Sequence, residues 1–361
     1  MKILWINHRD QRHPEAGGAE VHIAEVGKRL VKMGHEVTLL AERFEGSKPC
    51  EEIDGIQIVR FGGKLTLHIY APYFVKRNAG RYDIIVDDIA HAVPFWSPKF
   101  TEKPVVAIIH HVHQRVVEKE LPPIIRDVVK KAERTINKTY KNIVAVSHTT
   151  KEDLIQQLGV GEEKITVIYS GVDHEKYKPG PKFEEPTIVW MGRLKKYKNV
   201  DHLIRAFKLV KEDVKSARLL IIGSGEEEEN LRKLVSEMKL SGVTFTGWLR
   251  EEDKIRVLQG AWCITYVSEV EGWGMGVLEA NACGTPAVGY NSGALKEAII
   301  DGETGILLKY GDIRGLAEAL KEIIRNESLR RRLSENAIKY SQKFDWSKTA
   351  SQIESYLQDL L

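Results

Sequence analysis

Cysteine is scarce in this sequence, and long hydrophobic runs are absent from it. Cys50, Cys263 and Cys283 are too few and too scattered along 361 residues for a disulfide framework or a zinc site. No stretch of about 18 apolar residues occurs, which excludes a membrane-spanning helix. The apolar run at residues 3–6 ends too soon for an export signal and reads as a first strand. We therefore expect a chain that works in a reducing, cytoplasmic compartment.

Net charge is also low, at +3, but it is unevenly distributed. Residues 55–141 hold 15 Lys or Arg against 8 Asp or Glu, a local excess of +7. An anionic partner near this stretch and an ordinary solvated basic face both account for the excess. The hydrophobic fraction of 42% supports packed cores, and the length favours two domains over one.

Short β-branched runs alternate with amphipathic stretches, and this alternation occurs twice. It predicts an α/β protein with two domains, each built on a parallel sheet with helical crossovers. Pro179, Gly180 and Pro181 mark a linker, so the domains are expected at residues 1–178 and 184–344. A last helix at residues 345–361 either packs back on the first domain or forms part of an outer layer. The expected strands are residues 3–6, 36–40, 56–61, 83–86, 105–109, 142–146, 164–168, 187–191, 217–222, 243–246, 263–267 and 287–290.

The segment at residues 268–286 follows an expected strand and combines glycines with two glutamates. Three glycines at alternate positions let backbone N–H groups approach a diphosphate closely, and the N-terminus of the following helix favours an anion. Glu271 in the loop and Glu279 in the helix are placed to accept hydrogen bonds from ligand hydroxyls. Local capping or pairing by Glu279 is the alternative.

Glu271 and Glu279, separated by seven residues within a Ser-x-x-Glu-Gly-x-Gly context, resemble the double-glutamate motif of retaining glycosyltransferases of family 4. Other pieces in the family's order extend over nearly the whole chain. They are Gly17-Gly18-Ala19-Glu20, Ala145-Val146-Ser147, Ser170-Gly171-Val172-Asp173, Gly192-Arg193-Leu194, Gly223-Ser224-Gly225 and Phe245-Thr246-Gly247. The resemblance implies the GT-B fold, in which two Rossmann-like domains face each other across a cleft. It also implies retaining transfer of a sugar from a nucleotide-diphosphate donor to a hydroxyl.

The resemblance assigns roles to particular residues. It implies that Arg193 and Lys198 bind the donor diphosphate, that Glu279 holds the ribose and that Glu271 holds the transferred sugar. A bidentate Arg and a point-charge Lys after a strand suit a leaving diphosphate, although an ordinary surface pair is the alternative. Gly17 and Gly18 would meet the phosphate or the acceptor from the other domain on hinge closure. The expected donor-binding residues are Gly17, Gly18, Arg193, Lys198, Gly223, Gly225, Glu271, Gly272, Trp273, Gly274, Met275, Gly276 and Glu279.

Three histidines follow the expected strand at residues 105–109. His110 matches by position the family histidine that lies beside the donor sugar. Zinc is an alternative, but no neighbouring cysteine or acid has ligand spacing, so we expect neither a metal nor a cofactor. His111, His113, Asp87 and Asp88 are candidate acceptor contacts, with structural histidines and solvated loop carboxylates as alternatives. The expected catalytic residues are His110, Arg193, Lys198 and Glu271.

Other functions fit the sequence less well. A dinucleotide-dependent oxidoreductase is disfavoured because Gly223-Ser224-Gly225 is followed by four glutamates in place of a third glycine. A glycoside hydrolase needs a carboxylate pair across an open cleft, whereas the two glutamates are better explained as hydroxyl binders. A nucleotide-sugar epimerase and a non-catalytic sugar-nucleotide-binding protein share the fold and stay open as alternatives.

Two segments of the first domain mix apolar and aromatic residues with cations, at residues 64–77 and 121–131. Segments of this kind lie on anionic membrane surfaces. We therefore expect a peripheral enzyme on the cytoplasmic face of a membrane, with a lipid-linked sugar or glycolipid as acceptor and no nucleic-acid partner. A buried apolar face and a soluble sugar acceptor are the alternatives.

Overall fold

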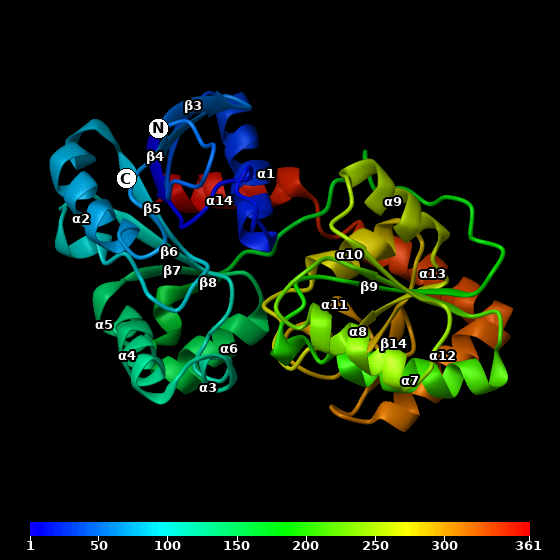
Figure 1. The fold of residues 1–361 in the computed structure, drawn as a ribbon. Helices are drawn as coiled ribbons and strands as arrows, with labels where there is room; N and C mark the ends of the chain where they lie inside the picture. The colour runs from blue at the N-terminus through cyan, green and yellow to red at the C-terminus, as the bar shows by residue number, and fades with distance from the viewer. The chain divides into compact units, whose positions relative to one another are not determined.

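The computed structural model describes the backbone of residues 1–361 and all side chains other than that of Lys119. The chain divides into two compact units (Figure 1). The first comprises Met1–Ser170 together with Trp346–Leu361, and the second comprises Gly171–Asp345.

The first unit is built on an eight-stranded sheet with the order β3-β4-β2-β1-β5-β6-β7-β8. β3 pairs antiparallel with β4, and the other neighbouring strands are parallel. The two central strands are almost wholly buried, as expected when both faces of a parallel sheet are covered. The elements are β1 (Lys2–Ile6), α1 (Gly18–Lys32), β2 (Glu36–Ala41), β3 (Cys50–Ile53), β4 (Ile56–Arg60), α2 (Leu67–Asn78), β5 (Ile84–Ile89), β6 (Val105–Ile109), α3 (Val117–Glu120), α4 (Pro123–Arg134), α5 (Ile136–Thr139), β7 (Asn142–Ala145), α6 (His148–Leu158), β8 (Ile165–Val167) and α14 (Trp346–Gln358), with 3-10 turns at Ala79–Arg81, Ser97–Lys99 and Glu162–Lys164.

Helix α14 belongs to the first unit although it follows the second in the chain (Figure 1). Its Glu354 Oε1 lies 2.6 Å from Nε2 of His35, and the ring of Trp346 lies edge-on to His22 of α1 with centroids 5.7 Å apart. The apolar side of α14 is buried. The last segment of the chain therefore completes the layer that α1 begins.

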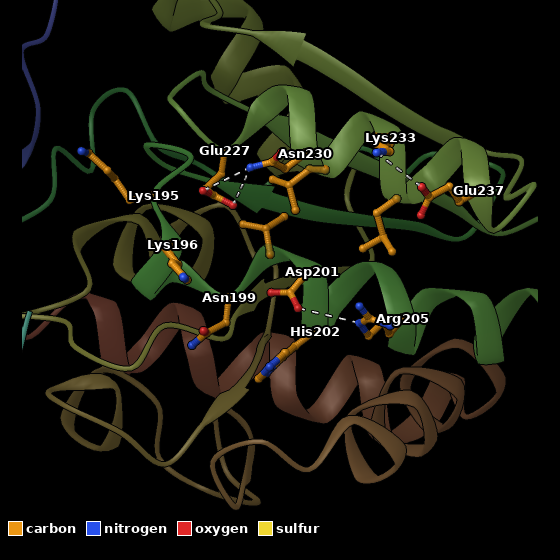
Figure 2. A pocket seen from close by; sticks show the side chains of 13 residues that line it. Lys195, Lys196, Asn199, Asp201, His202, Arg205, Glu227, Asn230, Lys233 and Glu237 are labelled. Atoms are coloured by element: carbon orange, nitrogen blue, oxygen red, sulfur yellow. Dashed lines mark hydrogen bonds and ion pairs between the residues drawn. The ribbon is translucent and has the colours of Figure 1, made fainter. Parts of the chain in front are cut away.

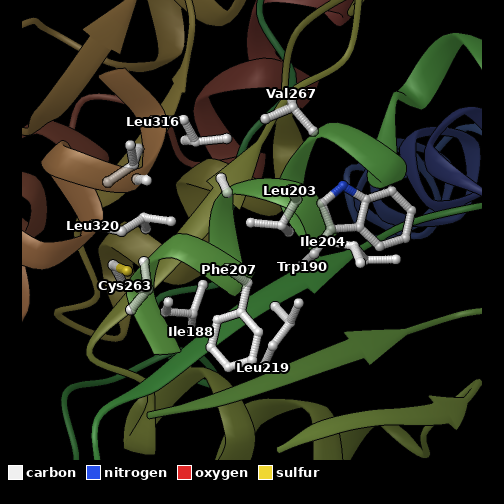
Figure 3. Packing of buried hydrophobic residues seen from close by; sticks show 14 of the residues in the cluster. Ile188, Trp190, Leu203, Ile204, Phe207, Leu219, Cys263, Val267, Leu316 and Leu320 are labelled. Carbon is white, nitrogen blue, oxygen red and sulfur yellow. The ribbon is translucent and has the colours of Figure 1, made fainter. Parts of the chain in front are cut away.

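The second unit is built on a six-stranded parallel sheet with the order β11-β10-β9-β12-β13-β14. Its core packs α7 and α12 against the sheet, and Figure 3 shows Phe207 of α7 and Leu316 of α12 among these side chains with Trp190 of β9. The elements are β9 (Thr187–Met191), α7 (Val200–Asp213), β10 (Arg218–Ile222), α8 (Glu228–Glu237), β11 (Val243–Gly247), α9 (Glu251–Gly260), β12 (Cys263–Tyr266), α10 (Met275–Ala282), β13 (Ala287–Tyr290), α11 (Leu295–Ala298), β14 (Gly305–Leu308), α12 (Ile313–Arg325) and α13 (Glu327–Ser341), with a 3-10 turn at Lys196–Lys198.

The boundary between the units differs from the one expected at the proline-rich linker. The first unit ends at Ser170, and residues 171–178 pack with the second unit. Val172 forms a bridge with Asp345, and the Tyr177 hydroxyl donates to Glu251 Oε1 at 2.6 Å. Proline and glycine mark a turn in the chain, but these contacts within the second unit place the division before that turn.

Every strand expected from the sequence is present, with ends that differ by no more than three residues. β3 and β14 were not expected. β3 reads Cys-Glu-Glu-Ile, with no apolar alternation, and it is an edge strand held by a hairpin to β4. Asp54 and Gly55 form the turn with φ of 53° and 80°, the conformation that an Asp-Gly pair favours in a two-residue hairpin.

Candidate active site

Lys198 and Glu271 form a close ion pair at the carboxyl ends of β9 and β12. Lys198 Nζ lies 2.5 Å from Glu271 Oε1, which also accepts a hydrogen bond from Ser268 Oγ at 2.8 Å. Burial disfavours the ammonium, but the charge of Glu271 outweighs it and raises the pKa of Lys198. The second oxygen, Glu271 Oε2, makes no hydrogen bond within the described part of the chain, which leaves it open to a ligand hydroxyl.

Arg193 adds a second cation beside this pair. It follows β9 and is half-buried, and its charge has a small lowering effect on the pKa of Lys198, which Glu271 outweighs. Among the side chains that the structure describes, no carboxylate forms an ion pair with Arg193. Two cations and one carboxylate thus meet at this edge of the sheet, so the local charge is positive and favours an anion.

Glu279, on α10, is engaged by a neighbouring helix. Lys254 Nζ of α9 lies 3.4 Å from both carboxylate oxygens of Glu279. Burial raises the pKa of Glu279, while the charge of Lys254 and a hydrogen bond from Tyr177 act in the opposite direction. The pairing foreseen as the alternative is therefore present, although its partner lies on another helix. A carboxylate has about four acceptor positions, so this long ion pair leaves room for a ligand hydroxyl.

The glycines beside these residues are required by the packing of the protein itself, whether or not a ligand binds. A Cβ on Gly223, whose φ is 118°, would lie 1.9 Å from the carbonyl oxygen of Gly192. One on Gly225 would lie 2.4 Å from the oxygen of Leu194, and one on Gly276 would lie 2.0 Å from Oη of Tyr266. A side chain at any of these three positions would clash with a neighbouring backbone or side-chain atom, so the local packing requires glycine there.

Two other residues expected to bind the donor differ in exposure. Trp273 is only 4% exposed and lies edge-on to Phe344 with ring centroids 4.9 Å apart. Its ring packs inside the second unit, so only its backbone is suited to the donor contact expected of it. Met275 is half-buried at the first turn of α10, which Gly274 opens with a φ of 88°. Gly272 lies between Glu271 and Trp273 in the same loop.

Gly17 and Gly18 lie at the start of α1 in the first unit. The backbone N–H of Gly17 donates to Glu20 Oε2 at 2.6 Å, and Asn7 Nδ2 donates to the other oxygen of Glu20 at 3.3 Å. Glu20 is the third residue of the helix, and its carboxylate takes the backbone N–H of the N-cap residue Gly17, as in a capping box.

Asp87 and Asp88, proposed to contact the acceptor, are fully buried at the end of β5. Asp87 accepts hydrogen bonds from Ser97 and Tyr140, whereas Asp88 accepts from Trp5 Nε1 at 3.1 Å and lies 2.8 Å from His110 Nε2. Neither is a solvated loop carboxylate, and protein groups occupy their oxygens. Direct acceptor contact by these two residues stays a prediction, and their burial and protein hydrogen bonds argue against it.

The three histidines after β6 differ in their surroundings. His110 is held by Asp88 and has a side chain that is 14% exposed. His113 binds Glu133 of α4 through both its backbone N–H, at 2.6 Å, and Nδ1, at 3.2 Å, which makes it a structural histidine. His111 stacks obliquely on His113 with ring centroids 3.9 Å apart. Within the described side chains, no three potential ligands are grouped as a metal site.

A surface cavity of about 470 Å³ lies elsewhere in the second unit, between α7 and α8 (Figure 2). It is lined by side chains of both signs, including Arg205 paired with Asp201 and Lys233 paired with Glu237. None of the residues expected to bind the donor lines it. The charge in this cavity is largely compensated, unlike that around Arg193 and Lys198.

Sequence reasoning missed the residues that hold the expected ones in place. Lys254 and Tyr177 flank Glu279, Ser268 holds Glu271, and Trp5 holds Asp88. Ser268 begins the glycine-rich segment and could have been singled out there. The other three come from distant positions whose pairing no local spacing indicates.

Comparison with known proteins agrees with this geometry. The family described as group 1 glycosyl transferases matches residues 171–340, and glycosyltransferase family 4 matches residues 16–176. Sucrose-phosphate synthase from Thermosynechococcus elongatus superposes with a TM-score of 0.85 at 21% identity, covering 99% of this chain and 98% of that one. Anabaena Alr3699/HepE, solved with UDP and glucose, superposes with a TM-score of 0.83 at 20% identity, covering 99% and 100%. N-acetyl-alpha-D-glucosaminyl L-malate synthase of Bacillus anthracis is 24% identical over 97% of this chain and 96% of its own length.

The two sheet-based units and these structural likenesses show the GT-B fold, and the two family matches identify a glycosyltransferase. Together the two family matches extend from residue 16 to residue 340. The chain belongs to the glycosyltransferases of family 4.

Proposed function

We propose that this protein is a retaining, hexosyltransferase-like enzyme that moves a sugar from a nucleotide-diphosphate donor to a hydroxyl acceptor without a catalytic metal. The observation that carries the proposal is the group formed by Arg193, Lys198 and Glu271. Glu271 balances the charge of Lys198, and Arg193 leaves the group with a net positive charge. Its place at the carboxyl ends of parallel strands is where open α/β sheets bind ligands. The solved relative that contains UDP and glucose supports a nucleotide sugar as donor.

The proposed chemistry follows from charge. As the bond from the sugar to the diphosphate breaks, negative charge grows on the leaving oxygen. Arg193 and Lys198 stabilise that charge more in the transition state than in the ground state. Glu271 Oε2 accepts from a hydroxyl of the transferred sugar, and Glu279 accepts from the ribose. The two protein cations serve the purpose for which other enzymes use a divalent metal.

Donor binding in the presence of EDTA tests this proposal. In a panel of nucleotide-diphosphate sugars, we expect at least one to raise the unfolding temperature, because a ligand that binds the folded state stabilises it. With that donor, transfer should continue in EDTA and the product should retain the anomeric configuration by NMR. Loss of transfer in EDTA and its recovery with Mg²⁺ or Mn²⁺ would contradict the charge scheme. Interconversion of free nucleotide sugars would identify an epimerase, and binding without turnover a non-catalytic protein.

We also propose that the acceptor is a lipid-linked sugar or glycolipid, reached from an anionic membrane surface on the cytoplasmic side. Apolar side chains on two helical segments support this proposal. Leu65, just before α2, is 84% exposed, Ile69 on α2 is 72% exposed, and Ile124 on α4 is 82% exposed. Lys76 and Lys131 are exposed on the same two helices. The opposite side of α2 is buried and already packs the helix onto the first unit. The exposed apolar residues are therefore not needed for that packing. No described helix is long and apolar enough to cross a bilayer.

Sedimentation with liposomes tests the membrane proposal. We expect the protein to pellet with vesicles that contain anionic lipid at low salt, and to be released at about 0.5 M salt as screening shortens. Ile124→Ser should lower the bound fraction, because burial of one such side chain contributes about 1.5 to 3 kcal/mol. Leu361→Ser, which changes an exposed leucine outside these helices, is the control. A protein that stays in the supernatant and glycosylates a soluble acceptor efficiently would contradict the proposal.

A further inference from the structure

Asp88 joins three strands of the first unit through its two oxygens. Oδ2 accepts a hydrogen bond from Trp5 Nε1 of β1 at 3.1 Å, and Oδ1 lies 2.8 Å from Nε2 of His110, which directly follows β6. Asp88 itself lies on β5, between these two strands in the sheet. The carboxylate is fully buried. Donors from both sides therefore fix the orientation of the carboxylate, and the carboxylate in turn fixes the imidazole.

His110 has one ring nitrogen engaged and one free. Nε2 points to Asp88, whereas Nδ1 makes no hydrogen bond within the described part of the chain. The side chain is partly exposed, although the strand that precedes it is fully buried. A hydrogen bond at one imidazole nitrogen decides which nitrogen carries the proton and how the other is directed.

We propose that Asp88 is a positioning residue that holds Nε2 of His110 so that Nδ1 is presented to the donor sugar. This inference rests on the proposed function and on the family resemblance, which implies that His110 lies beside that sugar. Asp88 touches no substrate, and its effect passes through the imidazole.

The charges that face His110 determine what Nδ1 presents. Asp88 faces it from β5, and Glu20 and His22 face it from α1. Burial by itself lowers the pKa of His110, but the charge and hydrogen bond of Asp88, with Glu20, outweigh burial and raise it. Burial lowers the pKa of His22 to about 3, so His22 stays neutral. The contact with Asp88 therefore shifts His110 toward its protonated form, in which Nδ1–H can donate to a sugar hydroxyl.

Asp87 provides a matched comparison on the same strand. It is also fully buried and hydrogen-bonded, but its partners are Ser97 and Tyr140, and no contact joins it to His110. Asp87→Asn and Asp88→Asn therefore remove the same charge from the same strand. Only the second variant removes it from His110.

Kinetics and imidazole NMR of these two variants test the role of Asp88. We expect Asp88→Asn to lower kcat about 10- to 100-fold, the range typical of partners that orient a functional imidazole, with a smaller change in the donor KM. In histidine-labelled protein, with His110 assigned through His110→Gln, the midpoint of His110 titration should fall in Asp88→Asn. It should stay at the wild-type value in Asp87→Asn.

Trp5→Phe serves if Asp88→Asn fails to fold. It retains Asp88 but removes the donor to Oδ2, so the carboxylate becomes a stronger acceptor and the His110 midpoint should rise. An unchanged His110 titration in the folded variant, or equal kcat in Asp87→Asn and Asp88→Asn, would overturn the inference. Because NMR needs no substrate, it decides the Asp88–His110 relation even where wild-type protein transfers no sugar. Wild-type protein that transfers no sugar would overturn the proposed function but not the relation between Asp88 and His110.

Discussion

Replacing Lys198 with methionine should lower kcat by about 10²- to 10³-fold while changing the donor KM far less. In the proposed mechanism Lys198 faces a diphosphate whose charge grows in the transition state, and loss of one donor to such a charge typically has this effect. Glu279→Ala is the contrasting variant, because ribose contacts are equally strong in the ground state and the transition state. It should weaken donor binding by about 1.5 to 3 kcal/mol and leave kcat nearly unchanged. Steady-state kinetics with the donor found by the thermal-shift panel provide the measurement.

The ion pair complicates the Lys198 variant in a way that can be controlled. Lys198→Met leaves the largely buried carboxylate of Glu271 without its cation, which costs stability. The unfolding temperature and circular dichroism of each variant therefore have to be compared with those of the wild type. Folded Lys198→Met protein with wild-type kinetics would remove Lys198 from the proposed site. Folded Glu279→Ala protein with normal KM would do the same for Glu279.

Mild acid should destabilise the first unit through two buried histidines. Burial lowers the pKa of both His8 and His22 to about 3, with further lowering from His68 at His8 and from His110 at His22. Their pKa is close to 6.5 in the unfolded chain, so between pH 6.5 and about 3 the unfolded state binds more protons. Stability is therefore lost as the pH falls through this window. At pH 5 the loss is about 2 kcal/mol for each histidine.

Hydrogen exchange at pH 7 and pH 5, corrected for intrinsic rates, measures this loss in each unit. Amides of β1 should lose protection at pH 5, and His22→Gln should reduce the difference between the two pH values. His202→Gln, in the second unit, is the control and should leave β1 unaffected. Equal protection of β1 in wild-type protein at both pH values would contradict the prediction.

The strands were predictable where burial of both faces gives uninterrupted apolar runs. Residues 3–6 and 105–109 are such runs, and both lie in the interior of the first sheet. β3 lacks this signature because it is an edge strand, and its Asp54-Gly55 turn was the signal that would have found it. Its inward-facing Glu51 pairs with the buried Arg60, so the side of β3 that faces the protein carries no apolar alternation.

The site was predictable only as far as the motif residues extend. Glu271 and Lys198 lie 73 positions apart in sequence and form an ion pair in the structure; the family resemblance assigned both to the donor site but did not predict that they pair. The burial of Asp87 and Asp88 could not be foreseen. It is made possible by hydrogen-bond donors from Trp5, Ser97 and Tyr140, which satisfy the buried carboxylates. Local spacing carries no information about such distant donors.

The return of α14 to the first unit has a consequence for the order in which the units form during synthesis. The second unit is continuous from Gly171 to Asp345, so the ribosome has made all of it before α14 exists. The first unit has by then waited through the synthesis of 175 residues with the α1 surface that receives Trp346 uncovered. Nascent chains generally fold their N-terminal domain first. Here the second unit is complete in sequence before the first unit is. Until α14 is made, the uncovered face of α1 is a surface that a chaperone for apolar segments can bind.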